Sequence, residues 1–174
     1  FYELDGTPND LDPRHILSNV IDRLGAVGLT PVAAVELEFY LLDTLGPRPD
    51  AATGPVTGHR SRDIQVYGLR EMEDFKPFFD DLYAACDTQG LPLESGISEY
   101  AAGQFEFTLR HKADALRAAD DAVMYKRLVK GIAVKHGMEA TFMAKPFADR
   151  AGSGMHLHVS MADESGANAF ASES

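Results

Sequence analysis

Hydrophobic residues along this 174-residue chain change between two spacings, one typical of helices and the other typical of strands. Helical spacing follows Asp12, a residue suited to capping a helix, and continues to Gly28, a residue suited to ending one. The same spacing returns from Asp74 to just before Gly90, and again over residues 114–136. We therefore expect three helices.

Strand-like segments lie between and after these helices. They cover residues 31–43, 97–110, 138–146 and 152–161, and the second is long enough to be a pair of strands or one bent strand. Residues 44–63 follow neither spacing, and we expect a flexible loop there. Alternating helices and strands in a chain of this length indicate one domain of mixed α and β structure around a sheet.

The first strand contains two acids within an otherwise apolar run. In the sequence AVELEFYLLD, Glu36, Glu38 and Tyr40 point to one face, because alternate side chains of a strand lie on opposite faces. The other face is wholly apolar. Glu36 and Glu38 therefore lie side by side, about 6.5–7 Å apart along the backbone. Their charges need compensation from elsewhere in the chain or from a bound cation.

Two later strands repeat this design, with one apolar face and one polar face. The polar faces carry Gln104, Glu106 and Thr108 in GQFEFTL, and His156, His158 and Ser160 in GMHLHVSM. Such a face is often simply solvated, as in many antiparallel sheets. None of the three polar faces contains Lys or Arg, however, and acids without cationic partners repel one another. This pattern favours a bound metal ion.

Carboxylates combined with imidazole favour Mg²⁺ or Mn²⁺ over a sulfur-rich zinc site. Glu99 precedes Glu106 by seven residues and is near enough in the chain to join the same site. The sequence GSG at residues 152–154 comes just before His156, and glycines let backbone N–H groups approach a carboxylate or phosphate closely. The sequence thus predicts a divalent-metal site beside an anion-binding loop.

Composition and charge narrow the classes of function. The formal net charge of −11 at pH 7 argues against a nucleic acid partner, because phosphate backbones require a basic face. No apolar run approaches the roughly 18 residues of a membrane helix, so no membrane partner is expected. A single cysteine, Cys86, excludes an internal disulfide and is compatible with the cytoplasm, where we expect the protein to act.

Four motifs in this order, VELEFYLLD, SEYAAGQFEF, FMAKPF and GSGMHLHVSM, resemble the catalytic domain of the glutamine synthetase family. The chain is most similar to the branch that makes γ-glutamylpolyamines or γ-glutamylputrescine. Two residues carry this second resemblance. One is Phe105 in GQFEF, and the other is Ala151, where ammonia-using members typically have Asn. It implies an α+β fold with a curved, mainly antiparallel sheet backed by helices, as part of a barrel-like catalytic domain.

The resemblance implies metal ligands on three segments of the chain. Glu38, Glu99 and Glu106 would hold one Mg²⁺ or Mn²⁺ ion on the amino-acid side of the site. Glu36 and His156 would hold a second ion beside the phosphates of ATP. The two acids of the first strand would therefore serve two different ions.

The resemblance also implies nucleotide and substrate contacts. His158 and Ser160 would lie along the nucleotide, and Gly152, Ser153 and Gly154 would bind the α-amino and α-carboxylate end of glutamate. The implied reaction uses ATP to form γ-glutamyl phosphate, from which ammonia or an amine displaces phosphate to give an amide. The implied enzyme is a homo-oligomeric ligase of nitrogen or polyamine metabolism.

Family features beyond these motifs are not recognisable in residues 1–174. They include a small N-terminal domain, several arginines, a third carboxylate for the second ion and a flap that shields the intermediate. The catalytic residues themselves therefore stay unassigned. We expect residues 1–174 to be a catalytically inactive part of a longer protein.

Two other interpretations stay open. A glutamine-synthetase-like protein that has lost turnover would keep the fold for a regulatory or structural role, although retention of all five expected metal ligands argues against it. A cupin-like barrel would use HLH in an iron site. Its glutamate should lie nearer to His158 than Glu164 does, and the long helices argue against an all-β barrel.

Overall fold

The computed structural model describes residues 1–171. Contacts between residues divide the chain into two compact units, and each is described by itself. The larger unit contains residues 35–110 and 121–156, and the smaller contains residues 1–34, 111–120 and 157 onward.

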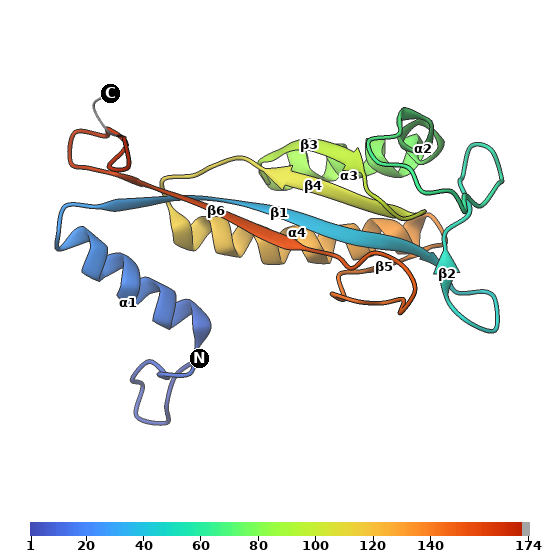
Figure 1. The fold of residues 1–174 in the computed structure, drawn as a ribbon. Helices are drawn as coiled ribbons and strands as arrows, with labels where there is room; N and C mark the ends of the chain where they lie inside the picture. The colour runs from blue at the N-terminus through green and yellow to red at the C-terminus, as the bar shows by residue number, and fades with distance from the viewer. Residues whose placement is uncertain (172–174) are drawn as a thin grey trace. The chain divides into compact units, whose positions relative to one another are not determined.

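Helices and pairs of strands follow one another along the described residues, so the chain mixes α and β structure as the sequence pattern predicts (Figure 1). The helices are α1 (Pro13–Gly25), α2 (Leu69–Asp74), α3 (Lys76–Gln89) and α4 (Ala115–Lys135). The strands are β1 (Thr30–Asp43), β2 (Asp50–Ala51), β3 (Leu93–Ser98), β4 (Gln104–Leu109), β5 (Glu139–Thr141) and β6 (Met155–Ala162).

The helix expected from Asp74 is α3, which begins two residues later, and the short helix α2 precedes it without having been expected. The short helix α2 ends at Asp74, and α3 begins at Lys76 with Pro77 in its first turn. Proline has no N–H to donate to a preceding turn, so a helix readily starts there but does not run through it. The segment expected as a strand pair or bent strand is a pair, and Gly103 with φ of +72° lies in the turn between β3 and β4.

The strands form one mainly antiparallel sheet with the order β2-β1-β4-β3, and β5 and β6 also pair with β1. In the β1–β4 register, Glu38 lies opposite Glu106 and Tyr40 lies opposite Gln104. Side chains of such cross-strand pairs share a face. The polar faces of β1 and β4 therefore form one surface, and the expected α+β fold is confirmed.

The apolar faces of β1 and β4 form the core of the larger unit. Leu37 and Phe39 of β1 and Phe105 and Phe107 of β4 are buried against α3 and α4. The helices contribute Phe78, Phe79, Leu82, Cys86, Tyr125, Val129 and Ala133. Each large side chain buried in this way contributes roughly 1.5–3 kcal/mol. This packing fixes the sheet, so its opposite face can hold polar groups in set positions.

Residues 44–63, expected as a flexible loop, contain the short strand β2 and no other helix or strand. Ala51 and Ala52 are buried. The carboxylate of Asp74 accepts hydrogen bonds from the backbone N–H groups of Val56 and Thr57. The segment is thus attached at two points, and its flexibility stays a prediction.

In the smaller unit, Asp12 caps α1 by accepting a hydrogen bond from the N–H of Arg14, as its position predicts. The helix ends at Gly25, earlier than expected, and Gly28 adopts a φ of +74° in the following turn. That conformation is easily reached only by glycine. No helix among the described residues is both long enough and apolar enough to cross a membrane.

Candidate metal centre

Three side chains from distant segments offer ligand atoms within 4.8 Å of one another, and they are Glu36, Glu106 and His156. Nδ1 of His156 lies 3.3 Å from Oε2 of Glu36 and 3.7 Å from Oε2 of Glu106. Atoms that bind one Mg²⁺ or Mn²⁺ at about 2.2 Å lie about 3–4.4 Å apart. Both distances from His156 lie in this range, as ligands of a shared cation require.

The sheet positions the ligands. Glu36 and Glu38 occupy alternate positions of β1 on the polar face, and Glu106 lies directly opposite Glu38 on β4. The N–H of Glu38 donates to the carbonyl oxygen of Gly154 at 3.1 Å. This bond holds the residues before β6 against β1 and so brings His156 to the acids. We call Glu36, Glu38, Glu99, Glu106 and His156 the acid cluster.

The carboxylates of the acid cluster disturb one another. Burial raises the pKa of Glu106, and the nearby charges of Glu36, Glu99 and Glu38 raise it further, while His156 opposes the shift. Burial also raises the pKa of Glu99, and the charge of Glu38 adds to this effect. Carboxylates in this state are destabilised as anions. A divalent cation among them would relieve that repulsion.

Glycines let the GSG loop approach the acid cluster. A Cβ atom on Gly154 would lie 2.8 Å from Oε1 of Glu38 and 3.3 Å from Nε2 of His156. A Cβ atom on Gly152 would lie 2.7 Å from the carbonyl oxygen of Ala144, and the N–H of Ser153 donates to that same oxygen. At position 152 a side chain would require the backbone to shift, whereas at position 154 it would displace the side chain of Glu38 from its place in the acid cluster. Binding of glutamate by this loop stays a prediction.

The two expected nucleotide contacts lie in the smaller unit. His158 is exposed and makes an edge contact with the ring of His111, with 6.0 Å between ring centroids. The hydroxyl of Ser160 donates to Oδ1 of Asn168 at 3.1 Å. Their role toward ATP stays a prediction.

The structure brings Glu106 to Glu36 and His156 as well as to Glu38. The resemblance assigns Glu106 to a different ion from Glu36 and His156, whereas the structure groups the ligand atoms of these three residues. No distance separates them into two sets, because Glu106 faces Glu38 across the strands and also approaches His156. The division of ligands between two ions therefore stays a prediction.

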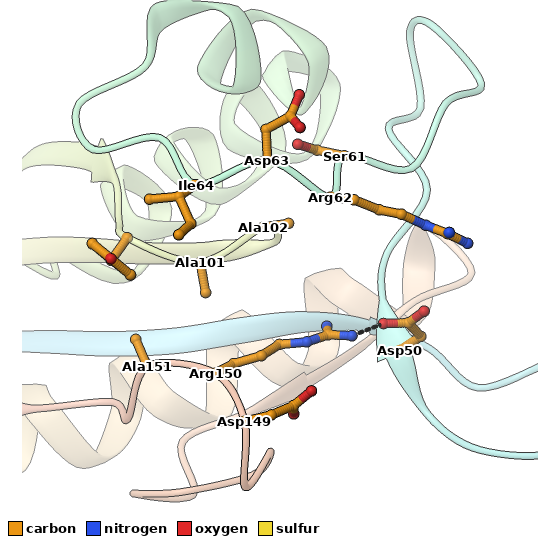
Figure 2. A pocket seen from close by; sticks show the side chains of 11 residues that line it. Asp50, Ser61, Arg62, Asp63, Ile64, Ala101, Ala102, Asp149, Arg150 and Ala151 are labelled. Atoms are coloured by element: carbon orange, nitrogen blue, oxygen red, sulfur yellow. Dashed lines mark hydrogen bonds and ion pairs between the residues drawn. The ribbon is translucent and has the colours of Figure 1, made fainter.

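A second group of acids in the same unit is bound by arginines. Arg60 donates to Asp43 at 2.6 Å and to Asp50 at 3.2 Å, and Arg150 forms an ion pair with Asp50 (Figure 2). The guanidinium group of Arg150 also lies 4.2 Å from the ring centroid of Phe147. We call Asp43, Asp50, Arg60 and Arg150 the arginine clamp. Sequence patterns did not indicate it, because its members come from separate segments.

A cavity of about 560 Å³ opens beside the arginine clamp (Figure 2). Its lining includes small side chains from two segments, and these are Ala101, Ala102 and Ala151. Acidic and basic side chains from the same and neighbouring segments also line it, and these are Asp50, Arg62, Asp63, Asp149 and Arg150. Because Ala151 directly precedes the GSG loop, the cavity adjoins the expected glutamate-binding residues.

Comparisons with known proteins agree with this fold. The chain matches the family described as glutamine synthetase, catalytic domain, over residues 10–174. It is 43% identical over 169 residues to gamma-glutamylputrescine synthetase PuuA of Escherichia coli strain K12. It is 36% identical over 174 residues to glutamate–isopropylamine ligase of a Pseudomonas species. These alignments cover 94% and 97% of this chain but 35% and 36% of the two relatives.

A solved structure described as a GmaS/ADP complex superposes with a TM-score of 0.85 at 30% sequence identity, and the match covers 98% of this chain and 38% of that one. The fold and these matches define an α+β catalytic domain of a ligase family. The chain belongs to the glutamine synthetase family, which confirms the resemblance seen in its four motifs.

Proposed function

We propose that the protein is an ATP-dependent ligase that joins the γ-carboxylate of glutamate to an amine. The observation that carries this proposal is the approach of Glu36, Glu106 and His156 within 4.8 Å on the polar face of the sheet. Phosphoryl transfer between anions depends on positioning and on neutralisation of charge, which such a cluster suits. The names of a γ-glutamylputrescine synthetase and a glutamate–isopropylamine ligase among its relatives support the reaction class.

The acid cluster would hold Mg²⁺ or Mn²⁺. In this proposal Glu38, Glu99 and Glu106 bind one ion, and Glu36 and His156 bind the second. When bound, the ions supply positive charge to the phosphates and to the transferring phosphoryl group. The raised pKa values of Glu99 and Glu106 support this assignment, because burial and neighbouring carboxylates both disfavour their anionic forms and a bound cation would offset that cost.

The reaction proceeds in two displacements. An oxygen of the glutamate γ-carboxylate attacks the γ-phosphorus of ATP, the bond from that phosphorus to ADP breaks, and γ-glutamyl phosphate forms. The amine nitrogen then attacks the acyl carbon, the bond to phosphate breaks, and the nitrogen loses a proton to give the amide. Gly152, Ser153 and Gly154 would orient glutamate, and His158 and Ser160 would lie along the nucleotide.

We propose an amine larger than ammonia as the acceptor. The cavity of about 560 Å³ lies in the range of about 300–1,000 Å³ typical of small-molecule sites, far more than ammonia would fill. Ala151 lines this cavity, and larger side chains at this position would reduce it. Asp63 and Asp149 in the lining suit a protonated amino group at the far end of such an acceptor.

We further propose that residues 1–174 are one section of a longer cytoplasmic enzyme and are inactive alone. The chain spans 35–36% of the length of the two curated relatives. A homo-oligomer is proposed because β6 leaves Met155, Leu157 and Val159 exposed, and apolar side chains of this kind are suited to contact with further chain or another subunit.

Phosphate release by the full-length protein tests the function. We expect release that requires glutamate and one acceptor from a panel of putrescine, spermidine, ethanolamine and ammonia. Glu38→Ala should abolish it, whereas Glu94→Ala should not, because Glu94 is an exposed acid of the same sheet outside the acid cluster. No phosphate release with any acceptor would contradict the proposal and favour an inactive relative of the family.

A further inference from the structure

The side chain of Gln104 is buried, with 1% of its surface exposed, and its amide has a partner on each side. Oε1 accepts a hydrogen bond from the N–H of Ala101 at 3.2 Å. Nε2 donates to Oε2 of Glu38 at 2.9 Å and to the carbonyl oxygen of Gly152 at 2.8 Å. One amide group therefore links an acid of the acid cluster to the glycine loop.

This arrangement needs an amide. The N–H of Ala101 requires an acceptor, which fixes the orientation of the Gln104 side chain. The two N–H donors then face the carboxylate of Glu38 and the carbonyl of Gly152. A carboxylate at position 104 would offer only acceptors to these two acceptors, and an apolar side chain would leave both without a donor.

The residue across from Gln104 supports the same loop. Tyr40 lies opposite Gln104 in the β1–β4 register, and its hydroxyl donates to the carbonyl oxygen of Ala151 at 2.7 Å. Two consecutive carbonyls of the loop are thus held by one cross-strand pair. Gln104 of this pair also donates to the carboxylate of Glu38, so its amide joins the side chain of Glu38 to the loop, beside the backbone bond from Glu38 to Gly154.

We infer that Gln104 is a positioning residue that couples metal binding at Glu38 to glutamate binding by the Ala151–Gly154 loop. The inference rests on the proposed function. Coupling between two binding sites is reciprocal, so a metal ion that fixes Glu38 also favours the loop geometry that binds glutamate, and glutamate tightens metal binding in return. Removal of the amide should lower metal affinity and also uncouple the two ligands.

Calorimetric titration of the full-length protein with Mn²⁺, with and without glutamate, tests the inference. Gln104→Met keeps the length of the side chain but removes both donors. We expect Mn²⁺ affinity to fall about tenfold, the range seen when a partner of a metal ligand is lost. We also expect glutamate to tighten Mn²⁺ binding in the unmodified protein but not in the variant, and the KM for glutamate to rise more than the KM for ATP.

Gln65→Met is the matched control. The Gln65 amide donates to the carboxylate of Glu71 at 3.0 Å, so this variant loses the same kind of hydrogen bond outside the acid cluster. Thermal unfolding without metal measures the structural cost of each variant. Gln65→Met should leave Mn²⁺ affinity and its dependence on glutamate unchanged, and an equal loss in both variants would overturn the inference.

The outcomes separate the inference from the proposed function. Mn²⁺ binding that Gln104→Met leaves unchanged overturns the role of Gln104 alone. Absence of Mn²⁺ binding by the unmodified protein overturns the proposed function, and this inference with it. If Gln104→Met does not fold, hydrogen exchange of the unmodified protein replaces it. Mn²⁺ should slow amide exchange over residues 151–154, and unchanged exchange would overturn the coupling.

Discussion

The acid cluster and the arginine clamp both gather carboxylates in the larger unit, but they treat the charges in opposite ways. In the arginine clamp, burial raises the pKa of Asp50, yet the hydrogen bond from Arg150 and the other contacts outweigh it and leave the pKa below its ordinary value. In the acid cluster, the pKa values of Glu99 and Glu106 are raised. The arginine clamp neutralises its carboxylates with arginine side chains, whereas the acid cluster disfavours the anionic form of Glu99 and Glu106.

This difference shows that the chain does neutralise acids where they serve structure. Arg60 bridges Asp43 and Asp50, and so attaches the loop before α2 to the end of β1 and to β2. Glu36 and Glu106 each form an ion pair with His156, which is charged only when it is protonated. Partly buried carboxylates without a permanent cationic partner lower the stability of the fold. A binding site for a divalent cation would explain why the acid cluster keeps them.

The largest expected effect is on metal binding. Glu106→Gln removes one ligand and one charge, and Mn²⁺ affinity of the full-length protein should fall about 100-fold. Asp50→Asn, the same change in the arginine clamp, should leave Mn²⁺ affinity unchanged. Isothermal titration calorimetry measures both. Equal losses in the two variants would show that the regions do not differ in function.

The second effect is a loss of stability in the arginine clamp. Asp50→Asn leaves the guanidinium groups of Arg60 and Arg150 without their shared carboxylate, and both are half-buried. We expect the free energy of unfolding to fall by about 2 kcal/mol, between the values typical of exposed and buried pairs. Denaturant unfolding without metal measures it. A gain in stability would mean that the clamp is not structural.

The third effect has the opposite sign. Glu106→Gln removes a charge that lies opposite Glu38 and near Glu36, so the metal-free protein should gain about 0.5–1 kcal/mol of stability. Addition of Mn²⁺ should raise the melting temperature of this variant by less than it raises that of the unmodified protein. Thermal melting with EDTA and with Mn²⁺ checks both parts. Destabilisation of the EDTA-treated variant would contradict the repulsion that we infer.

The smallest effect is a dependence on pH. The pKa of Asp50 in the folded protein is below its ordinary value of 3.8, so its ion pairs contribute stability above that pH. That contribution is lost as the pH falls below 3.8 and through the folded pKa. In this range the unfolded state takes up a proton at a higher pH than the folded state does, so acid favours unfolding. The difference in stability between the unmodified protein and Asp50→Asn should therefore shrink over this range. Denaturant midpoints at successive pH values measure it, and a constant difference would contradict the assignment.

Local patterns were enough to predict much of this molecule. Strict alternation placed Glu36 and Glu38 on one face of β1, and the same rule placed Glu106 and His156 on polar faces. The apolar faces of β1 and β4 lie in the core as expected. These features depend only on neighbours within one strand, so a single sequence can show them.

Features that join distant segments could not be predicted in the same way. Asp50 and Arg150 are separated by 100 residues, and no local period relates them. The grouping of Glu106 with His156 depends on which strands pair and in which register. Gln104 was placed correctly on its polar face, but its bond to Gly152 appears only once the GSG loop is folded against the sheet.

Crystals of the full-length protein soaked in Mn²⁺ and measured at a wavelength where manganese scatters anomalously test the central claim most directly. We predict anomalous peaks within the acid cluster, one about 2.2 Å from ligand atoms of Glu36 and His156 and one about 2.2 Å from those of Glu38, Glu99 and Glu106. A map with no peak among these side chains, or with manganese only beside Asp43 and Asp50, would contradict the claim that the acid cluster holds a divalent cation.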